Sequence, residues 1–334
     1  MNEACGEDNT TDNRPGRQAM VINTWALALC GWLLANSCMA ATTLQLRTET
    51  DGNHYHYQWQ DLQQQPQQLE FVLTANPALS PYRPYRPEMM STELQQALLQ
   101  AASKLPAGIT LQFDGHPRHG RYQLKGGSAT QRAAALQQLQ QRQQQARQQF
   151  IERHHYAEIR LSDGQRGLIP DHLYYISASI PALAPVAATL KLQRSGANPR
   201  PTAEWLLGWV QGIPYETMDN RFGNNSADFR PPLTVLQEHR GDCDAKAALL
   251  AALLRARFPR LGLTLVYLPE HALLGIDLPH SRGEQYLQWQ GQRMLLAEVA
   301  GPALLPLGQL SERSRTLIAA GQYSQREVPR LAQP

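Results

Sequence analysis

Short alternating runs of hydrophobic and polar residues dominate the first part of the chain. The run "TLQLRTETDGNHYHYQWQ" alternates on both sides of Asp51-Gly52, a dipeptide typical of a tight hairpin turn. Its second half places aromatic residues on one face and histidines on the other, namely Tyr55, Tyr57 and Trp59 opposite His54 and His56. With no third ligand nearby, the histidines indicate a solvated strand face and no metal site.

Longer segments show the 3.6-residue period of amphipathic helices. "STELQQALLQAASKLP" predicts a helix that is capped by Ser91 or Thr92 and ended by Pro106. Residues 130–151 predict a glutamine-rich helix, and residues 202–216 and 243–257 predict two more helices. Strand pairs are expected in "GITLQFDG" with "GRYQLKGG", in "YAEIRLSDGQRGLIP", and in "QYLQWQ" with "RMLLAEVAG".

The distribution of these segments predicts two domains. "SIPALAPVAATLKLQRSGANPRP" is rich in proline and alanine and lies between two patterned regions, which indicates a boundary near residue 195. We therefore expect an N-terminal α+β domain over residues 41–195 and a second domain over residues 196–334. In the second domain helices come first and strands follow, which again favours an α+β fold, and a polar tail ends the chain.

The first 40 residues have the pattern of an export signal. Arg14 and Arg17 precede an uncharged stretch that is most apolar at residues 25–34, and small residues around Ala40 follow it. Two alternatives stay open: the segment could remain as a membrane anchor, or Cys38 could carry a lipid. In each case we expect an exported protein, either periplasmic or anchored to the inner membrane and facing the periplasm.

Composition and charge narrow the class of protein. The 334 residues are 42% hydrophobic and 18% charged, which is typical of a globular protein. The formal charge at pH 7 is only +3 and basic residues form no long run, so the sequence gives no case for nucleic-acid binding.

Cysteine usage becomes informative once the export signal is set aside. Of the four cysteines, Cys5, Cys30 and Cys38 fall in the first 40 residues, which leaves Cys243 alone in the remaining chain. A single cysteine forms no internal disulfide in an oxidising compartment. Cys243 is therefore either a reactive thiol or a small buried hydrophobic residue.

Three residues with complementary chemistry lie in the C-terminal third of the chain. Cys243 occupies the first turn of a predicted helix, where unpaired N–H groups and the helix dipole lower the pKa of a thiol. Either Asp242 or Gly241 is expected to cap the helix, but Asp242 and Asp244 oppose ionisation of the thiol, so a base is needed. His271 at the start of a strand supplies one, and Glu298 in an apolar run is suited to orient its ring.

These segments together resemble a known superfamily. "GDCDAKAALLAALL", "HALLGI", "LLAEVAGP" and the upstream "WVQGIPYE" are similar to the transglutaminase-like cysteine hydrolases, in their bacterial exported branch, over about residues 200–305. The resemblance implies a papain-like, transglutaminase-like catalytic domain, in which the helix bearing the cysteine packs on an antiparallel sheet.

The resemblance also implies a role for each residue. It makes Cys243 the nucleophile, His271 the general base and Glu298 the orienting acid. Gln211 and the backbone N–H of Cys243 would form the oxyanion hole. The family usually has Asp where this chain has Glu298, and Asp277 is the substitute acid if Glu298 points away.

The implied function is that of an exported cysteine peptidase or amidase, which opens amide bonds through a thioester. The expected substrate is a protein or peptide, with peptidoglycan stem peptides among the options, and neither a cofactor nor a metal is expected. If an amine replaces water as the acceptor, the same site becomes a transamidase that forms crosslinks. Two alternatives without catalysis stay open: a transglutaminase-like scaffold or binding module of the cell envelope, and an envelope protein whose glutamine-rich helix packs on itself.

Overall fold

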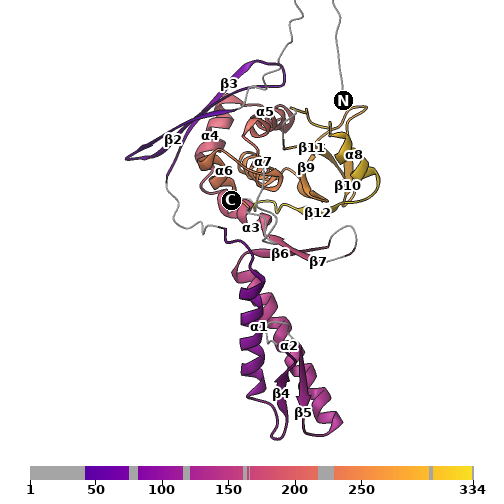
Figure 1. Ribbon diagram of the computed structural model, residues 1–334. Coiled ribbons are helices and arrows are strands. Elements are labelled where there is room, and N and C mark those ends of the chain that lie inside the picture. The colour runs from indigo at the N-terminus through magenta and orange to yellow at the C-terminus, as the bar shows by residue number, and fades with distance from the viewer. Residues whose placement is uncertain are drawn as a thin grey trace, which may run out of the picture. The chain divides into compact units, whose positions relative to one another are not determined.

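The computed structural model describes residues 42–74, 82–115, 121–160, 164, 166–216, 229–300 and 304–332. The expected export signal lies outside these residues. All of the described residues belong to one compact unit that extends from Met39 to Pro334. Within it the chain mixes helices with antiparallel sheets, which confirms the predicted α+β class (Figure 1).

A three-stranded sheet opens the described chain and confirms the predicted hairpin. Its strands are β1 (Thr43–Glu49), β2 (Gly52–Gln60) and β3 (Pro66–Leu73), paired antiparallel in that order. Glu49 pairs with Gly52 at the turn. The aromatic face of β2 is buried as expected, and the hydroxyl of Tyr57 donates to the carbonyl of Leu236 at 2.5 Å.

Two long helices, α1 (Pro87–Ala102) and α2 (Ala129–Arg153), lie side by side and enclose the strand pair β4 (Thr110–Phe113) and β5 (Tyr122–Lys125) in their connection (Figure 1). Their shared core is small and is built around Leu98 and Leu139. The predicted start of the first helix is wrong. A proline at position 87 begins it one turn earlier, and the hydroxyl of Thr92 bonds back to the carbonyl of Glu88.

The proline- and alanine-rich segment that was expected to separate two domains is largely helical. After the hairpin of β6 (Tyr156–Arg160) and β7 (Arg166–Pro170) come α3 (His172–Ser179) and α4 (Ala184–Gln193). Val186 and Leu190 of α4 are fully buried. Among the described helices none alone is long and apolar enough to cross a membrane; α3 and α4 qualify only when joined, and they are bent by 71°.

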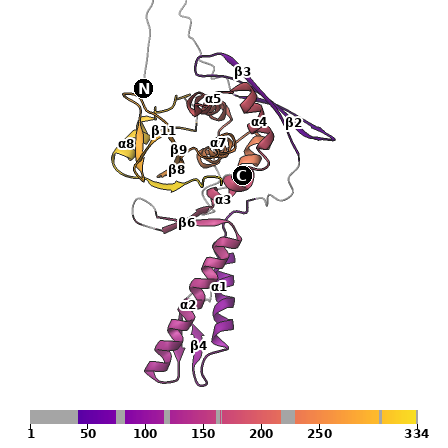
Figure 2. The same cartoon turned by 180° about the vertical axis from the view of Figure 1, so that it is seen from behind.

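The C-terminal half surrounds one buried helix. The helices here are α5 (Pro199–Gly212), α6 (Pro232–Glu238) and α7 (Cys243–Arg257). Figures 1 and 2 show α7 between the helices α3 to α6 and the strand β9, and α7 is buried on nearly every side.

A five-stranded antiparallel sheet covers the other side of α7. Its order is β10 (Tyr286–Trp289), β11 (Gln292–Ala297), β9 (His271–Asp277), β8 (Leu263–Leu268) and β12 (Ser324–Glu327). The last strand and the helix α8 (Glu312–Ala319) replace the polar tail that the sequence predicted. That prediction is wrong because β12 completes the sheet by pairing with β8.

The expected boundary near residue 195 does not coincide with a break in the hydrophobic core. One cluster of buried residues contains the aromatic face of β2 and β3 together with α5 and α7. Trp59 of β2 meets Trp205 of α5 edge to face at 4.6 Å, and Tyr57 meets Trp209 at 4.9 Å. Residues on both sides of position 195 therefore build the environment of α7.

Candidate active site

The start of α7 is fixed by its own sequence. Asp242 is the helix cap, as predicted, and its carboxylate accepts from the N–H of Ala245 at 3.0 Å. The preceding turn is set by His239, whose φ of 53° is left-handed. A parallel β-bridge between Tyr215 and Gly241 then ties this turn to the end of α5. Cys243 is the first residue of the helix.

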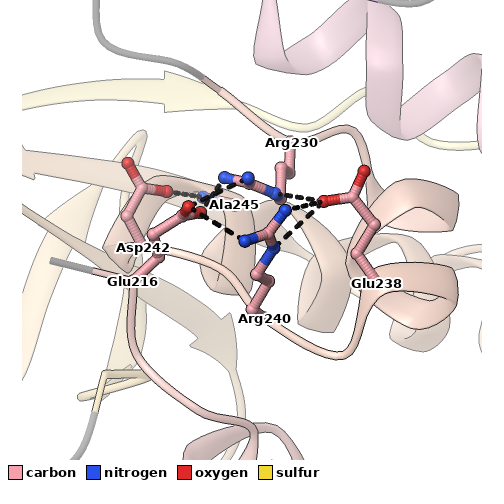
Figure 3. A network of polar contacts seen from close by, with 6 residues as sticks. All are labelled: Glu216, Arg230, Glu238, Arg240, Asp242 and Ala245. Atoms are coloured by element: carbon pink, nitrogen blue, oxygen red, sulfur yellow. Dashed lines mark hydrogen bonds and ion pairs between the residues drawn. The ribbon is translucent and has the colours of Figure 1, made fainter. Parts of the chain in front are cut away.

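Two arginines and two glutamates, which we call the arginine clasp, hold the loop ahead of Cys243 (Figure 3). Arg230 donates to Glu238 at 2.8 Å and to Glu216 at 3.0 Å, and Arg240 donates to Glu238 at 3.0 Å. The hydrogen bond from Arg230 and then that from Arg240 hold the pKa of Glu238 below its usual range despite partial burial. The clasp therefore joins the loop on both sides of α6 to the chain that follows α5.

Lys246 joins α7 to the end of α5 from the inside. The side chain is fully buried, and its Nζ donates to the carbonyls of Gln211, at 3.3 Å, and of Ile213. A cation at a helix C-terminus is favourable, because the last carbonyls of the helix have no partner within it. Burial lowers the pKa of Lys246 to about 8, although the charge of Asp242 opposes that shift.

His271 and Glu298 form a contact pair, as the sequence predicted. His271 begins β9 directly after Glu270, whose φ of 61° makes the tight turn from β8, and its Nε2 is bonded to Oε1 of Glu298. The remaining ring nitrogen, Nδ1, is thereby left for another partner. Glu298 follows β11, which pairs with β9, so the sheet register brings the two side chains together.

The first turn of α8 completes the surroundings of Glu298. The N–H of Ser311 donates to Oε2 of Glu298 at 3.2 Å, and the hydroxyl of Ser314 donates to Oε1 at 3.3 Å. Burial alone would raise the pKa of Glu298. The hydrogen bonds from His271, Ser311 and Ser314 outweigh burial and lower it, so the carboxylate is ionised.

A cleft of about 410 Å³ opens over this pair. Its walls mix polar groups with an apolar floor and are formed by Tyr215, Glu270, His271, Glu298, Ala300, Leu305, Ser311, Arg313, Ser314 and Leu317. Glu270 and Arg313 form an exposed ion pair at 3.0 Å beside His271. The cleft offers an imidazole and a carboxylate to any ligand that enters it.

Cys243 is buried, with 3% of its surface exposed. Its Sγ donates to Oδ1 of Asp244 at 3.4 Å and accepts from the N–H of Ala272, the residue after His271. Burial, followed by the charges of Asp244 and Asp242, raises the pKa of the thiol well above its usual range. The lowering of the thiol pKa that was expected from the start of the helix is therefore outweighed. In the described chain no hydrogen bond joins Sγ to the ring of His271.

The structure does not place Gln211 as an oxyanion donor. Both hydrogens of its buried Nε2 are used, one for the carbonyl of Glu298 at 2.6 Å and one for that of Leu305 at 2.9 Å. Gln211 therefore holds the backbone of Glu298 in place. Asp277, the substitute acid, is not needed because Glu298 contacts His271. Asp277 lies six residues further along β9, which is about 20 Å from His271.

Sequence reasoning missed several residues that hold the site residues in place. Ser311 precedes a short amphipathic segment and is a recognisable helix cap, which was the one available signal for α8. Lys246 in an alanine- and leucine-rich helix is a buried charge that needed a partner. No sequence signal connects His172 of α3 with Asp244, whose carboxylate it approaches to 3.4 Å.

One group in the described ranges has three side chains that could share a metal ion, namely Glu49, Asp51 and His54 at the turn of the first hairpin. The two carboxylates are exposed, and His54 already donates to Asp51 at 2.8 Å. None of these residues lines the cleft over His271.

Comparison of the chain with protein-family models, with curated proteins and with solved structures found no match.

Proposed function

We propose that the protein is an exported cysteine peptidase or amidase, with a papain-like, transglutaminase-like arrangement of Cys243, His271 and Glu298. One observation carries the proposal. His271 lines a cleft with one ring nitrogen bonded to an ionised carboxylate, and the next residue along the strand donates its N–H to the thiol of Cys243. These contacts support a proposal that combines a nucleophile, a base and a group that orients the base.

The reaction begins with transfer of the thiol proton to Nδ1 of His271. The thiolate of Cys243 attacks the carbonyl carbon of an amide, and the oxygen takes the negative charge. Glu298 keeps its proton-free form and stabilises the imidazolium. His271 returns the proton to the nitrogen, the amine or ammonia leaves, and a thioester remains. Water then attacks the thioester with His271 as base, which gives the acid and restores the thiol.

The oxyanion is assigned to backbone donors in this proposal. Cys243 is the first residue of α7, and the first four N–H groups of a helix have no partner within it. These groups and the helix dipole favour a negative charge at the same end. Gln211 contributes indirectly, because its amide holds the backbone of Glu298.

The decisive experiment offers the purified full-length protein a mixture of proteins and peptides, including peptidoglycan stem peptides, and follows products by mass spectrometry. New N-termini report peptidase action, a mass gain of one unit at glutamine or asparagine reports deamidation, and incorporation of an added amine reports transamidation. We expect products from the wild type and none from Cys243→Ala or His271→Ala. His280→Ala, outside the cleft, is the matched histidine control.

Formation of product by Cys243→Ala would refute the proposed chemistry. Absence of product from the wild type, with the fold intact by circular dichroism, would favour the scaffold alternative. Amine incorporation that exceeds hydrolysis would make the protein a transamidase with the same three residues.

Export is the second part of the proposal, and the sequence before Thr42 supports it. Fractionation of bacterial cells that express the full chain, with the N-terminus of the product determined by mass spectrometry, tests it. A product that begins near Ala41 in the periplasm indicates cleavage, and an intact product in the membrane fraction indicates an anchor. Recovery of the intact chain in the cytoplasm contradicts export.

A further inference from the structure

A second histidine–carboxylate pair lies beside Cys243, and neither of its residues lines the cleft over His271. Sγ of Cys243 donates to Oδ1 of Asp244 at 3.4 Å, and Oδ2 of Asp244 lies 3.4 Å from Nε2 of His172. The other nitrogen of that ring, Nδ1, lies 2.8 Å from the hydroxyl of Tyr267 on β8. A chain of polar contacts thus runs from α7 through α3 to the sheet.

The histidine of this pair is buried, although the carboxylate of Asp244 is 23% exposed. His172 is 1% exposed, its ring meets Phe229 edge to face at 4.6 Å, and it stacks with Tyr267 at 5.6 Å. It does not line the cleft in which His271 stands. Any effect of His172 on the thiol must therefore pass through Asp244.

The direction of the proton in the Sγ–Asp244 contact follows from the charge of Asp244. Burial would raise the pKa of this carboxyl, but the nearby ring of His172 and the S–H of Cys243 bring it down to about 2. Asp244 is therefore ionised at neutral pH and can only accept. The proton between sulfur and oxygen belongs to the thiol.

The groups that face the thiol come from every element packed around it. Helix α7 contributes Asp242, Asp244 and the buried Lys246, and β9 contributes the N–H of Ala272 next to His271. Burial and the two carboxylates disfavour the thiolate, whereas the backbone N–H of Ala272 and the charge of Lys246 favour it. Of the two carboxylates, Asp242 is the helix cap, and Asp244 accepts from Sγ.

We infer that His172 and Asp244 act as a positioning pair that binds the Cys243 thiol proton and keeps the resting nucleophile neutral. Under the proposed function, on which this consequence rests, catalysis begins when the S–H turns from Asp244 toward His271. No bond other than that hydrogen bond changes in this step. The buried pair sets the starting state, and the pair in the cleft carries out the proton transfer.

The test uses the full-length protein and alkylation by iodoacetamide between pH 5 and pH 10. The extent of reaction is read on the peptide that carries Cys243 by mass spectrometry, so that Cys5, Cys30 and Cys38 do not contribute. Alkylation needs no substrate. Failure of the product assay above therefore leaves this result valid, and failure here leaves the product assay valid.

Asp244→Asn keeps the size of the side chain and removes the charge. We expect the midpoint of the pH dependence of Cys243 alkylation to fall by at least one pH unit in this variant, and the rate of alkylation at pH 7 to rise about tenfold or more. His172→Gln keeps a donor toward Asp244 but removes the chargeable ring, so its rate at pH 7 stays at or below that of the wild type. Glu204→Gln, which removes a carboxylate of α5 far from the contacts of the thiol, is expected to match the wild type.

Two results overturn the inference. If Asp244→Asn reacts no faster than the wild type, the contact does not hold the thiol proton. If Asp244→Asn and His172→Gln both react faster by similar factors, the pair merely closes the structure and both variants loosen it. Should Asp244→Asn fail to fold, Asp244→Ser makes the same comparison with a smaller neutral acceptor.

Discussion

Cys243 lies near two histidine–carboxylate pairs that differ chiefly in which member is exposed. In the first, His271 has 21% of its side chain exposed and lines a cleft with Glu298, which is 5% exposed; in the second, His172 is 1% exposed and the carboxylate of Asp244 is 23% exposed. We name the pairs after their histidines, the first open and the second sealed. The carboxylate is ionised in both pairs because its histidine offsets the effect of burial. Under the proposed function, the exposed imidazole of His271 is the one that can exchange protons with a substrate.

The largest expected effect is on activity, and it concerns the open pair of His271 and Glu298. Glu298→Gln keeps the shape of the side chain but removes the charge that stabilises an imidazolium on His271. Under the proposed function we expect kcat/KM to fall by about 10³-fold or more. Asp277→Asn serves as the control, since Asp277 does not contact His271. Equal losses in both variants would show that Glu298 has no special relation to the base.

The second effect is on stability, where we expect the larger loss from the histidine of the sealed pair. His172→Ala removes the buried ring that lies between Asp244 and Tyr267 and leaves a cavity, and we expect the free energy of unfolding to fall by about 3 kcal/mol. His271→Ala leaves Glu298 with Ser311 and Ser314, and we expect a loss below about 1 kcal/mol. Urea denaturation at pH 7 measures both. Similar losses for the two histidines would remove the distinction between open and sealed.

The third effect is the dependence of stability on acidic pH. The pKa of Asp244 is about 2 in the folded protein and 3.8 in an ordinary carboxyl, so its stabilising contribution is complete above pH 4 and is lost as the pH falls toward 2. The pKa difference corresponds to about 2 kcal/mol. Urea denaturation at pH 5 and pH 3 should show the gap between wild type and Asp244→Asn narrowing at the lower pH. A gap that is constant with pH would contradict the charged state of the pair.

The smallest effect is expected at the rim of the cleft. Glu270 and Arg313 form an ion pair with side chains 75% and 70% exposed, and such pairs contribute little to stability. Arg313→Ala should therefore change the free energy of unfolding by less than about 0.5 kcal/mol, in the same urea assay. A larger loss would mean that the rim, and not the buried contacts around Glu298, holds α8 in place.

Much of the open pair could be predicted from local sequence. The cap at Asp242, the helix from Cys243 and the strand that begins at His271 are each marked by residues next to them. Glu298 was found because an acid in an apolar run needs a partner, and the pairing of β9 with β11 supplies it. Patterns of this kind work where the deciding interactions lie within a few residues.

The sealed pair and the supports of the site could not be predicted in this way. His172 lies just before the proline- and alanine-rich segment, in a stretch for which no element was predicted, and its distance from Asp244 depends on how α3 packs on α7. Gln211 was assigned by resemblance, but its amide is engaged by two carbonyls that only tertiary structure brings near. The core shared across residue 195 was missed for the same reason, because the aromatic contacts between β2 and α5 are long-range.

Thr42, at the start of β1, is fastened to three points of the fold. Its N–H donates to the carbonyl of Gly212 at 2.9 Å, its hydroxyl donates to that of Trp209 at 3.1 Å, and its own carbonyl accepts from His239 at 2.6 Å. A Cβ on Gly212 would lie 2.2 Å from the Thr42 hydroxyl, so only glycine leaves room for this docking. Thr42 thus connects the end of α5, which carries Gln211, with the turn that leads into Cys243. A group attached to the chain just before Thr42, whether a tag, an anchor or a freshly cut end, is therefore connected through Thr42 to the end of α5 and to the turn before Cys243.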